Sequence, residues 1–382
     1  RLVKWSNIVY SERLRQLEEA KKHVDNGKLN CIPFYEAYPR LSKYLPGIVK
    51  GTYYIVSANS GIGKTQLAKH MFVLTPYRFI KNNPDCGLKL KILYFALEES
   101  REEFIDSLIV AHLFEKYGIS IDTLQLRSMY KNSLSQDILD KLKECQEYFN
   151  DLFNCVEVID SVSNPTGIYK YCRDYSEQHG KHIHTTREFT EKDSFGNEKK
   201  TNERVYSHYE PNDPNEYVIV LTDHISLLGE ESGMNKHQTM SKWSVDYCRK
   251  QITKHWKYIV VNIQQQSSES EKQQFTISGK SIESKLEPSL DGLGDNKMTQ
   301  RDALVVLGLF APDRYGIEVH NGYNIKVLKD NYRQLSILKN RIGRSNLKIP
   351  LYFKGESNHF EELPPVEEFI QNPLLYNKYK GG

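Results

Sequence analysis

The sequence predicts an α/β fold with a mostly parallel central sheet, antiparallel strands at one edge and a β-hairpin insertion. Continuous apolar runs at residues 217–222 and 258–263 are typical of strands that are covered on both faces of a sheet. Segments with helical periodicity separate such runs, as expected for parallel βαβ units. A loop with two glycines follows the strand at 51–57 and leads into a helix at 66–72, which is the arrangement of a phosphate-binding loop.

The other elements follow from the same patterns. Leu14 and Leu17 recur at helical spacing within residues 10–27, and Asn26-Gly27 ends that helix, so residues 1–30 are assigned to an N-terminal linker helix region. Strands are expected at 91–97, 156–160 and 303–310, and helices from residue 100 and at 135–150. Closely spaced runs indicate antiparallel hairpins at one edge of the sheet, at residues 323–328, 335–339 and 349–353.

Two polar segments interrupt this order. Alternating side chains on both sides of residues 194–197 predict a β-hairpin insertion at 182–208, and residues 265–296 are interpreted as a long loop. Basic hairpin residues leave a DNA or partner contact open beside a merely solvated hairpin: Arg187, Lys199 and Lys200. Four histidines are expected to be exposed rather than metal ligands: His179, His182, His184 and His208.

The composition sets limits on the class of protein. The chain has 382 residues, of which 39% are hydrophobic and 26% charged, so a sizeable folded core is expected. No apolar run is long enough for a membrane span, and six cysteines without a CxxC pair indicate reduced thiols in a cytoplasmic protein. A net charge of +3 neither requires nor excludes a nucleic acid, because a narrow basic channel can exist on a nearly neutral protein.

The glycine-containing loop carries the clearest chemical signal. It consists of Ser60, Gly61, Ile62, Gly63, Lys64 and Thr65. In such loops, backbone N–H groups and the helix N-terminus bind phosphates, the lysine contacts the β- and γ-phosphates, and the hydroxyl coordinates Mg²⁺. The first glycine of the usual pattern is replaced by Ala58, another small residue, so we interpret the loop as a variant P-loop for ATP and Mg²⁺.

Three polar residues at strand ends are candidates for the rest of the nucleotide site. Asp223 ends the 217–222 strand and is favoured over Asp160 as the carboxylate that supports Mg²⁺. Glu98, at the end of the 91–97 strand, is placed to activate water, although a helix N-terminal acid is the alternative. Gln264, at the end of the 258–263 strand, is a candidate γ-phosphate contact, and spacing alone hardly distinguishes it from its neighbours Gln265 and Gln266.

With these motifs the sequence resembles DnaB-type replicative DNA helicases, whose C-terminal domain is a RecA-like ATPase. Residues 57–65 resemble their P-loop, 93–100 resemble "FFSLEMS", 220–227 resemble "IVIDYLQL", 261–265 resemble "ALSQL" and 338–344 resemble "GKQRNG". The resemblance spans residues 31–363, which is taken as the RecA-like ATPase domain, and leaves 364–382 as a C-terminal tail. It implies that Glu98, rather than Glu99, is the catalytic base.

The resemblance also implies an assembly and partners. Family members are homohexameric rings that bind ATP between subunits and single-stranded DNA in the central channel, so Lys339 and Arg341 are implied to act on the neighbouring subunit's ATP. The family's DNA loop corresponds to Asp295, Asn296, Lys297 and Arg301, with Gly294 in place of the usual arginine. The family's N-terminal collar has no counterpart in this sequence, which suggests a phage or mobile-element protein in a host-cell cytoplasm with a primase or helicase loader as partner.

Two other functions remain open from the sequence. One is a RecA- or RadA-type recombination ATPase, although such a chain more often ends its second strand with Asp-Thr-Glu than with Ala96-Leu97-Glu98. The other is a KaiC-like regulatory ATPase that binds proteins and not DNA. Unwinding of a forked duplex would separate the helicase from both.

Overall fold

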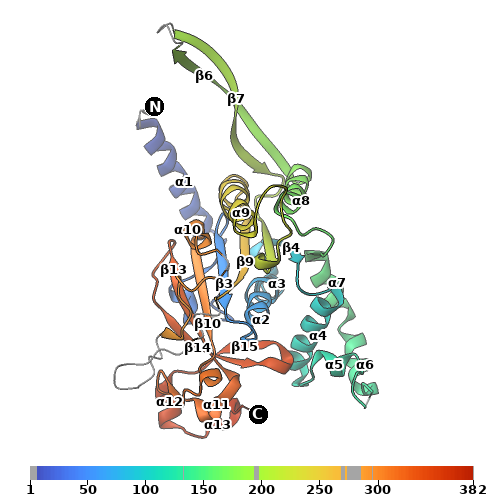
Figure 1. Ribbon diagram of the computed structural model, residues 1–382. Coiled ribbons are helices and arrows are strands. Elements are labelled where there is room, and N and C mark those ends of the chain that lie inside the picture. Colours follow the sequence, from blue (N-terminus) through green and yellow to red (C-terminus); the bar gives the residue numbers. More distant parts are fainter. Residues whose placement is uncertain are drawn as a thin grey trace, which may run out of the picture.

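The molecule is built on a nine-stranded sheet with the order β15-β14-β13-β10-β3-β9-β8-β4-β5 (Figure 1). It was obtained as a computed structural model, which describes residues 7–131, 133–192, 198–267, 272, 285–294 and 296–381. The strands of this sheet are β3 (Tyr53–Ala58), β4 (Lys89–Ala96), β5 (Val156–Ile159), β8 (Glu216–Asp223), β9 (Ile259–Gln265), β10 (Val305–Phe310), β13 (Tyr332–Asn340), β14 (Lys348–Lys354) and β15 (His359–Glu362). Three two-stranded sheets are β1 (Ile32–Pro33) with β2 (Gly47–Ile48), β6 (Gly180–Lys192) with β7 (Glu198–Pro211), and β11 (Val319–His320) with β12 (Tyr323–Asn324).

The central sheet is parallel from β5 to β10 and antiparallel from β10 to β15. The predicted parallel sheet with antiparallel edge strands is therefore confirmed. In the register, Ala58 at the end of β3 lies beside Gln265 of β9, and Ala96 at the end of β4 lies beside Asp223 of β8. The carboxyl ends of the parallel strands thus bring the P-loop, the Glu98 region and Asp223 to one edge of the sheet.

Helices cover both faces of the sheet. Their bounds are α1 (Asn7–Asp25), α2 (Lys64–Lys69), α3 (Thr75–Asn82), α4 (Arg101–Tyr117), α5 (Thr123–Leu126), α6 (Gln136–Glu144), α7 (Gln146–Cys155), α8 (Pro165–Gln178), α9 (Lys236–Ser241), α10 (Thr299–Asp302), α11 (Ile325–Leu328), α12 (Val366–Gln371) and α13 (Leu375–Tyr379). A π-helical segment, His70–Leu74, joins α2 to α3, and a second, Lys242–Thr253, continues α9.

Alternation along the strands divides the core into two layers. On one face Val56 and Ile263 pack with Leu67 of α2 and with α4, in one large apolar cluster. On the other face Ile55 and Val260 pack with α8 and with the π-helical segment that carries Trp243. Such alternation means that neighbouring residues at a strand end face different helices, which matters below for Gln264 and Gln265.

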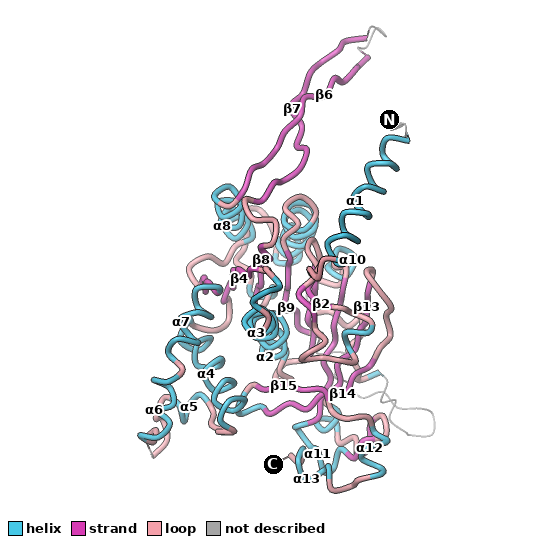
Figure 2. Tube along the Cα trace, turned by 180° about the vertical axis from the view of Figure 1, so that it is seen from behind, coloured by secondary structure: helices cyan, strands magenta, loops and turns pink. Residues whose placement is uncertain are grey.

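Two elements stand away from the body of the molecule. Figures 1 and 2 show α1 and the β6–β7 hairpin projecting on the same side of the sheet. The hairpin predicted at 182–208 is confirmed and is longer, spanning residues 180–211 with a register shift after Ile183. Its turn, residues 193–197, lies outside the described residues. Helix α1 agrees with the predicted helix at 10–27.

One predicted strand is wrong. Only Tyr323-Asn324 of the 323–328 run is extended, and the rest is the short helix α11. Ile325 and Leu328, three residues apart, are both fully buried in a separate aromatic cluster with α12 and α13, and a helical turn places both on one face. Residues 364–381 therefore pack against the antiparallel edge strands. None of the helices among the described residues is long and apolar enough to cross a membrane.

Candidate functional site

The P-loop leaves β3 at Ala58 and enters α2 at Lys64. Gly61 and Gly63 have φ angles of 74° and 103°, in the region where side chains other than glycine are strained. A Cβ on Gly63 would also lie 3.1 Å from the Phe353 ring, so glycine is required there for conformation and for space. Arg333 donates from Nε to the carbonyl of Ile62 at 2.8 Å and fixes the far side of the loop.

Lys64 is positioned for an anionic ligand. Its side chain is 7% exposed, and it makes no hydrogen bond or ion pair with the described residues. A buried ammonium without a counter-charge is costly, so this position favours binding of a negative group. The adjoining cavity, of about 690 Å³, is lined by the P-loop, Glu98, Glu99 and Asp223. Its residues fit a Mg²⁺-bound triphosphate.

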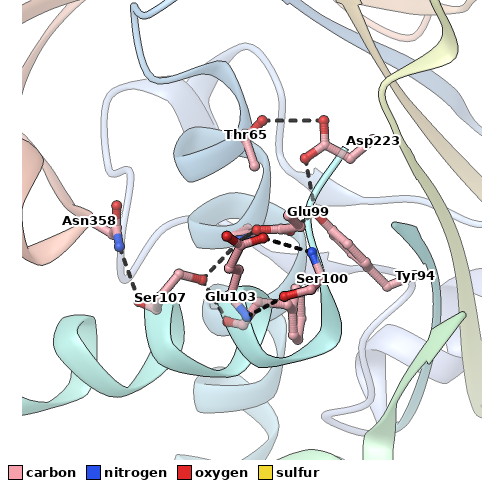
Figure 3. A network of polar contacts seen from close by, with 10 residues as sticks. Thr65, Tyr94, Glu99, Ser100, Glu103, Ser107, Asp223 and Asn358 are labelled. Atoms are coloured by element: carbon pink, nitrogen blue, oxygen red, sulfur yellow. Dashed lines mark hydrogen bonds and ion pairs between the residues drawn. The ribbon is translucent and has the colours of Figure 1, made fainter. Parts of the chain in front are cut away.

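A polar network lies behind Thr65, as Figure 3 shows. The Thr65 hydroxyl donates to Asp223 Oδ1 at 3.2 Å, and the Tyr94 hydroxyl lies 2.9 Å from Asp223 Oδ2. The same Tyr94 hydroxyl lies 2.5 Å from Glu99 Oε1, and Lys69 Nζ lies 2.6 Å from Glu99 Oε2. Because a tyrosine has one hydroxyl proton, it donates to only one of these two carboxylates at a time.

Asp223 has the environment of a metal-supporting carboxylate. Burial raises its pKa to about 6, and the nearby Glu99 carboxylate adds to this shift, while Lys69 opposes it. A divalent cation beside Thr65 would favour the ionised form of such a group. Asp160, the competing candidate, lies beyond β5 with a side chain 46% exposed, 4.0 Å from Arg101, and does not line the nucleotide cavity. The geometry therefore favours Asp223 over Asp160.

Glu98 and Glu99 differ in what they contact. Both oxygens of Glu99 are occupied, by Lys69 and Tyr94, and its side chain is 16% exposed. The Glu98 side chain is 53% exposed, lines the cavity and lies 3.5 Å from His224 Nε2. Only Glu98 is therefore open to a water molecule. A capping box between Ser100 and Glu103 begins α4 directly after this pair and fixes their position.

Gln264 does not face the nucleotide cavity. It is fully buried, its amide donates to the carbonyls of Gly294 and Asn296 at 2.7 and 3.0 Å, and its carbonyl accepts from the Thr299 hydroxyl at 2.6 Å. These bonds must break before Gln264 can contact a γ-phosphate. The strand alternation places Gln265 on the opposite face of the sheet, which is the face of α2.

The candidate DNA residues separate into a buried and an exposed group. Asn296 is 1% exposed, and its amide donates to the His237 carbonyl and the Ser241 hydroxyl. Its side chain is therefore not available to DNA in this structure, in contrast to the sequence expectation, because it holds the loop against α9. Lys297 and Arg301 are exposed. Asp295 lies outside the described residues.

Lys339 and Arg341 lie at the opposite edge of the sheet from the P-loop. Asn340 pairs with Val305 at the start of β10, and Val305 pairs with Tyr54 at the start of β3. The P-loop follows the other end of β3, about 13 Å further along the strand at roughly 3.3 Å per residue. These two cations therefore cannot serve the nucleotide site of their own chain.

The surroundings of Lys339 favour an anionic ligand. Its ammonium donates to the carbonyl of Gln300. Its pKa is lowered to about 8, first by burial and then by the neighbouring Arg341, with Arg249 adding to the effect and Asp302 opposing it. An incoming anion would offset this repulsion between cations.

Sequence reasoning missed Lys69 and Tyr94. Lys69 follows Thr65 by four residues on α2, which puts both side chains on one helical face, and Tyr94 shares the alternating face of β4 with Ala96. Both spacings were visible in the sequence. Their partner Glu99 was not separable from Glu98 until the contacts were known.

Comparisons with known proteins agree with this fold. A solved structure of a helicase ATPase domain matches with a TM-score of 0.63 and 18% identity, over 93% of this chain and 98% of that one. A structure described as a DnaB-like replicative helicase and its interactions with primase matches with a TM-score of 0.62 and 17% identity, over 95% of this chain and 69% of that one. No protein-family model and no curated protein sequence matches. The expected RecA-like ATPase fold is thereby confirmed.

Proposed function

We propose that the chain is the ATPase of a DnaB-type replicative DNA helicase, a homohexameric ring that translocates on single-stranded DNA by ATP hydrolysis at subunit interfaces. The proposal rests on one observation above all. The P-loop and its carboxylates line one edge of the sheet, whereas Lys339 and Arg341 lie at the other. Two halves of one site that cannot meet within a chain can meet between two copies arranged head to tail in a ring.

Each group has a defined role in this proposal. Lys64 holds the β- and γ-phosphates of ATP, and Thr65 with Asp223 holds Mg²⁺, which neutralises charge on the phosphates. Glu98 accepts the proton of the attacking water, and His224 orients its carboxylate. Lys339 and Arg341 from the adjacent subunit stabilise the negative charge that develops on the transferred phosphoryl group.

Helix α1 supports assembly. Four apolar side chains on it are exposed, by 43 to 72%: Tyr10, Leu14, Leu17 and Val24. The first three are spaced by four and three residues and thus form one stripe along the helix. An apolar stripe on a helix that stands away from its own domain is suited to docking on a second copy of the chain, as a linker helix would.

DNA binding is the finer part of the proposal. Lys297 and Arg301 are exposed beside the segment that Gln264 holds through the carbonyls of residues 294 and 296. We infer that this segment contacts the phosphate backbone of single-stranded DNA, through these cations and its backbone N–H groups. A contact with primase or a helicase loader is proposed on family resemblance alone.

The shared site is tested by mixing subunits. Arg341→Ala leaves the P-loop intact, so the variant should bind ATP normally, hydrolyse it on the order of a thousandfold more slowly and reduce wild-type turnover when mixed in. Arg344→Ala, also exposed on the same loop, serves as the matched control. Wild-type turnover that is undiminished by an excess of Arg341→Ala would exclude action in trans.

The helicase itself is tested on a forked duplex. Strand displacement that requires ATP, a hexameric mass in solution with ATP and single-stranded DNA, and DNA-stimulated hydrolysis at low salt are expected together. A filament with strand exchange but no unwinding would favour a recombination ATPase. Hydrolysis indifferent to DNA would favour a regulatory ATPase of the KaiC kind.

A further inference from the structure

A second polar cluster lies behind the P-loop helix, away from the nucleotide cavity. His70 follows α2 at the start of the π-helical segment, Glu115 is on α4, and His359 begins β15. Their ligand atoms all lie within 4.8 Å of one another, and this is the one such group found among the described residues. Three elements far apart in the sequence thus bring two imidazoles and a carboxylate together.

We propose that His70, Glu115 and His359 form a zinc site that ties the P-loop helix to α4 and β15. Zinc in proteins takes imidazole nitrogen and carboxylate oxygen at about 2.0–2.2 Å in tetrahedral geometry, which separates neighbouring ligand atoms by roughly 3.3 Å. Here Glu115 Oε1 lies 2.8 Å from His359 Nδ1 and 3.7 Å from His70 Nε2. The three atoms therefore need to move by only a few tenths of an ångström.

The remaining polar atoms of the three ligands are held by other side chains. Tyr38, fully buried, contacts His70 Nδ1 at 2.5 Å and leaves Nε2 facing Glu115. Arg78 contacts Glu115 Oε2 and leaves Oε1 for the metal. Such partners fix the tautomer and orientation of metal ligands and are typical of built zinc sites.

The surroundings allow a divalent cation and a fourth ligand. An adjoining cavity of about 660 Å³ is lined by three carboxylates, from Glu36, Glu115 and Glu361, against two cations, from Arg78 and Lys116. The lining is thus net negative by one charge when the histidines are neutral. Because the cavity is open, water can complete a three-ligand site, as it does where zinc keeps an open position.

The location gives the site a structural consequence. Phe360, next to His359, stacks on Phe353 with ring centroids 4.3 Å apart, and Phe353 lies against Gly63 of the P-loop. A metal at His359 would hold this pair of rings against the loop. The site is independent of whether the chain unwinds DNA.

The test begins with the wild-type chain, after removal of metal by a chelator. Zn²⁺ titration should give one equivalent bound per chain and should raise the melting temperature by roughly 5 °C at a hundredfold excess over Kd. Substituted Co²⁺ should give a tetrahedral visible spectrum without the charge-transfer band of thiolate ligands. Absence of stoichiometric Zn²⁺ binding, or a thiolate band, would overturn the proposal without any variant.

Variants then locate the bound metal. Glu115→Gln and His359→Gln should lose the binding, and Tyr38→Phe, which only releases His70 Nδ1, should weaken it by about 10- to 100-fold. The matched control is His208→Gln, because His208 is on the hairpin with a side chain 55% exposed. Unchanged Zn²⁺ affinity in folded His359→Gln would assign the metal elsewhere and refute the site, leaving an ion-pair cluster only.

Discussion

The two adjacent glutamates after β4 allow a sharp test of the site. Glu98→Gln keeps the size of the side chain but removes a proton acceptor that lines the cavity. Loss of a general base lowers the hydrolysis rate by about 10²–10⁴-fold, whereas an exposed substitution changes stability by no more than about 0.5 kcal/mol. Nucleotide affinity and melting temperature should therefore stay at wild-type values while single-turnover hydrolysis collapses.

Glu99→Gln should do the reverse. The Lys69–Glu99 pair is 2.6 Å long, with side chains 5% and 16% exposed, so its loss leaves a buried ammonium without its counter-charge. Breaking such a pair costs about 3–5 kcal/mol, and the lower end applies because the glutamine oxygen still accepts from Lys69. The unfolding entropy of 382 residues is about 0.8 kcal/mol/K, so a loss of 3 kcal/mol lowers the melting temperature by about 4 °C.

The assay is single-turnover hydrolysis at saturating Mg²⁺-ATP and DNA, with thermal unfolding of the same samples. Both variants are measured against wild type and against each other, so that a general defect in folding cannot be mistaken for lost chemistry. If Glu99→Gln abolished hydrolysis at an unchanged melting temperature while Glu98→Gln turned over normally, the assigned roles would be reversed and the reasoning refuted.

The contacts around the site support three more tests. Gln264→Ala removes three hydrogen bonds and should cost about 3 kcal/mol in urea unfolding, whereas Gln265→Ala should stay within about 0.5 kcal/mol; equal midpoints would contradict the assignment of faces. Because the pKa of Asp223 is raised to about 6, its ionisation opposes folding as the pH rises through that value and bound Mg²⁺ offsets this, so Mg²⁺-ATP should raise the melting temperature more at pH 7.5 than at pH 5.5; a pH-independent gain would count against it. Leu14→Glu with Leu17→Glu should reduce the mass in solution below that of the wild-type assembly without lowering the melting temperature of the domain, and an intact hexamer would remove α1 from the interface.

Residue types and their order were enough to predict the sheet and the position of the P-loop. Apolar runs without polar interruption can be stable only between two covered faces, so strands such as β8 and β9 were recognisable from residue type alone. The residue that ends a parallel strand lies at the ligand-binding edge whatever the loops do, and Asp223 was therefore identifiable. The run at 323–328 failed because two apolar residues three apart fit a strand end and a helical turn equally well, and the packing around Ile325 decided between them.

The role of each polar neighbour, in contrast, depends on how the elements pack. Glu98 and Glu99 are chemically identical in the sequence, and they differ because Lys69 and Tyr94, from two other elements, occupy one of them. Gln264 has the sequence position of a γ-phosphate contact, yet its hydrogen bonds go to residues 294–299, since those groups lie on its face of the sheet. Chain order fixes where a side chain starts, but its partners arrive from distant segments, and those contacts exist only once the sheet and its helices have packed.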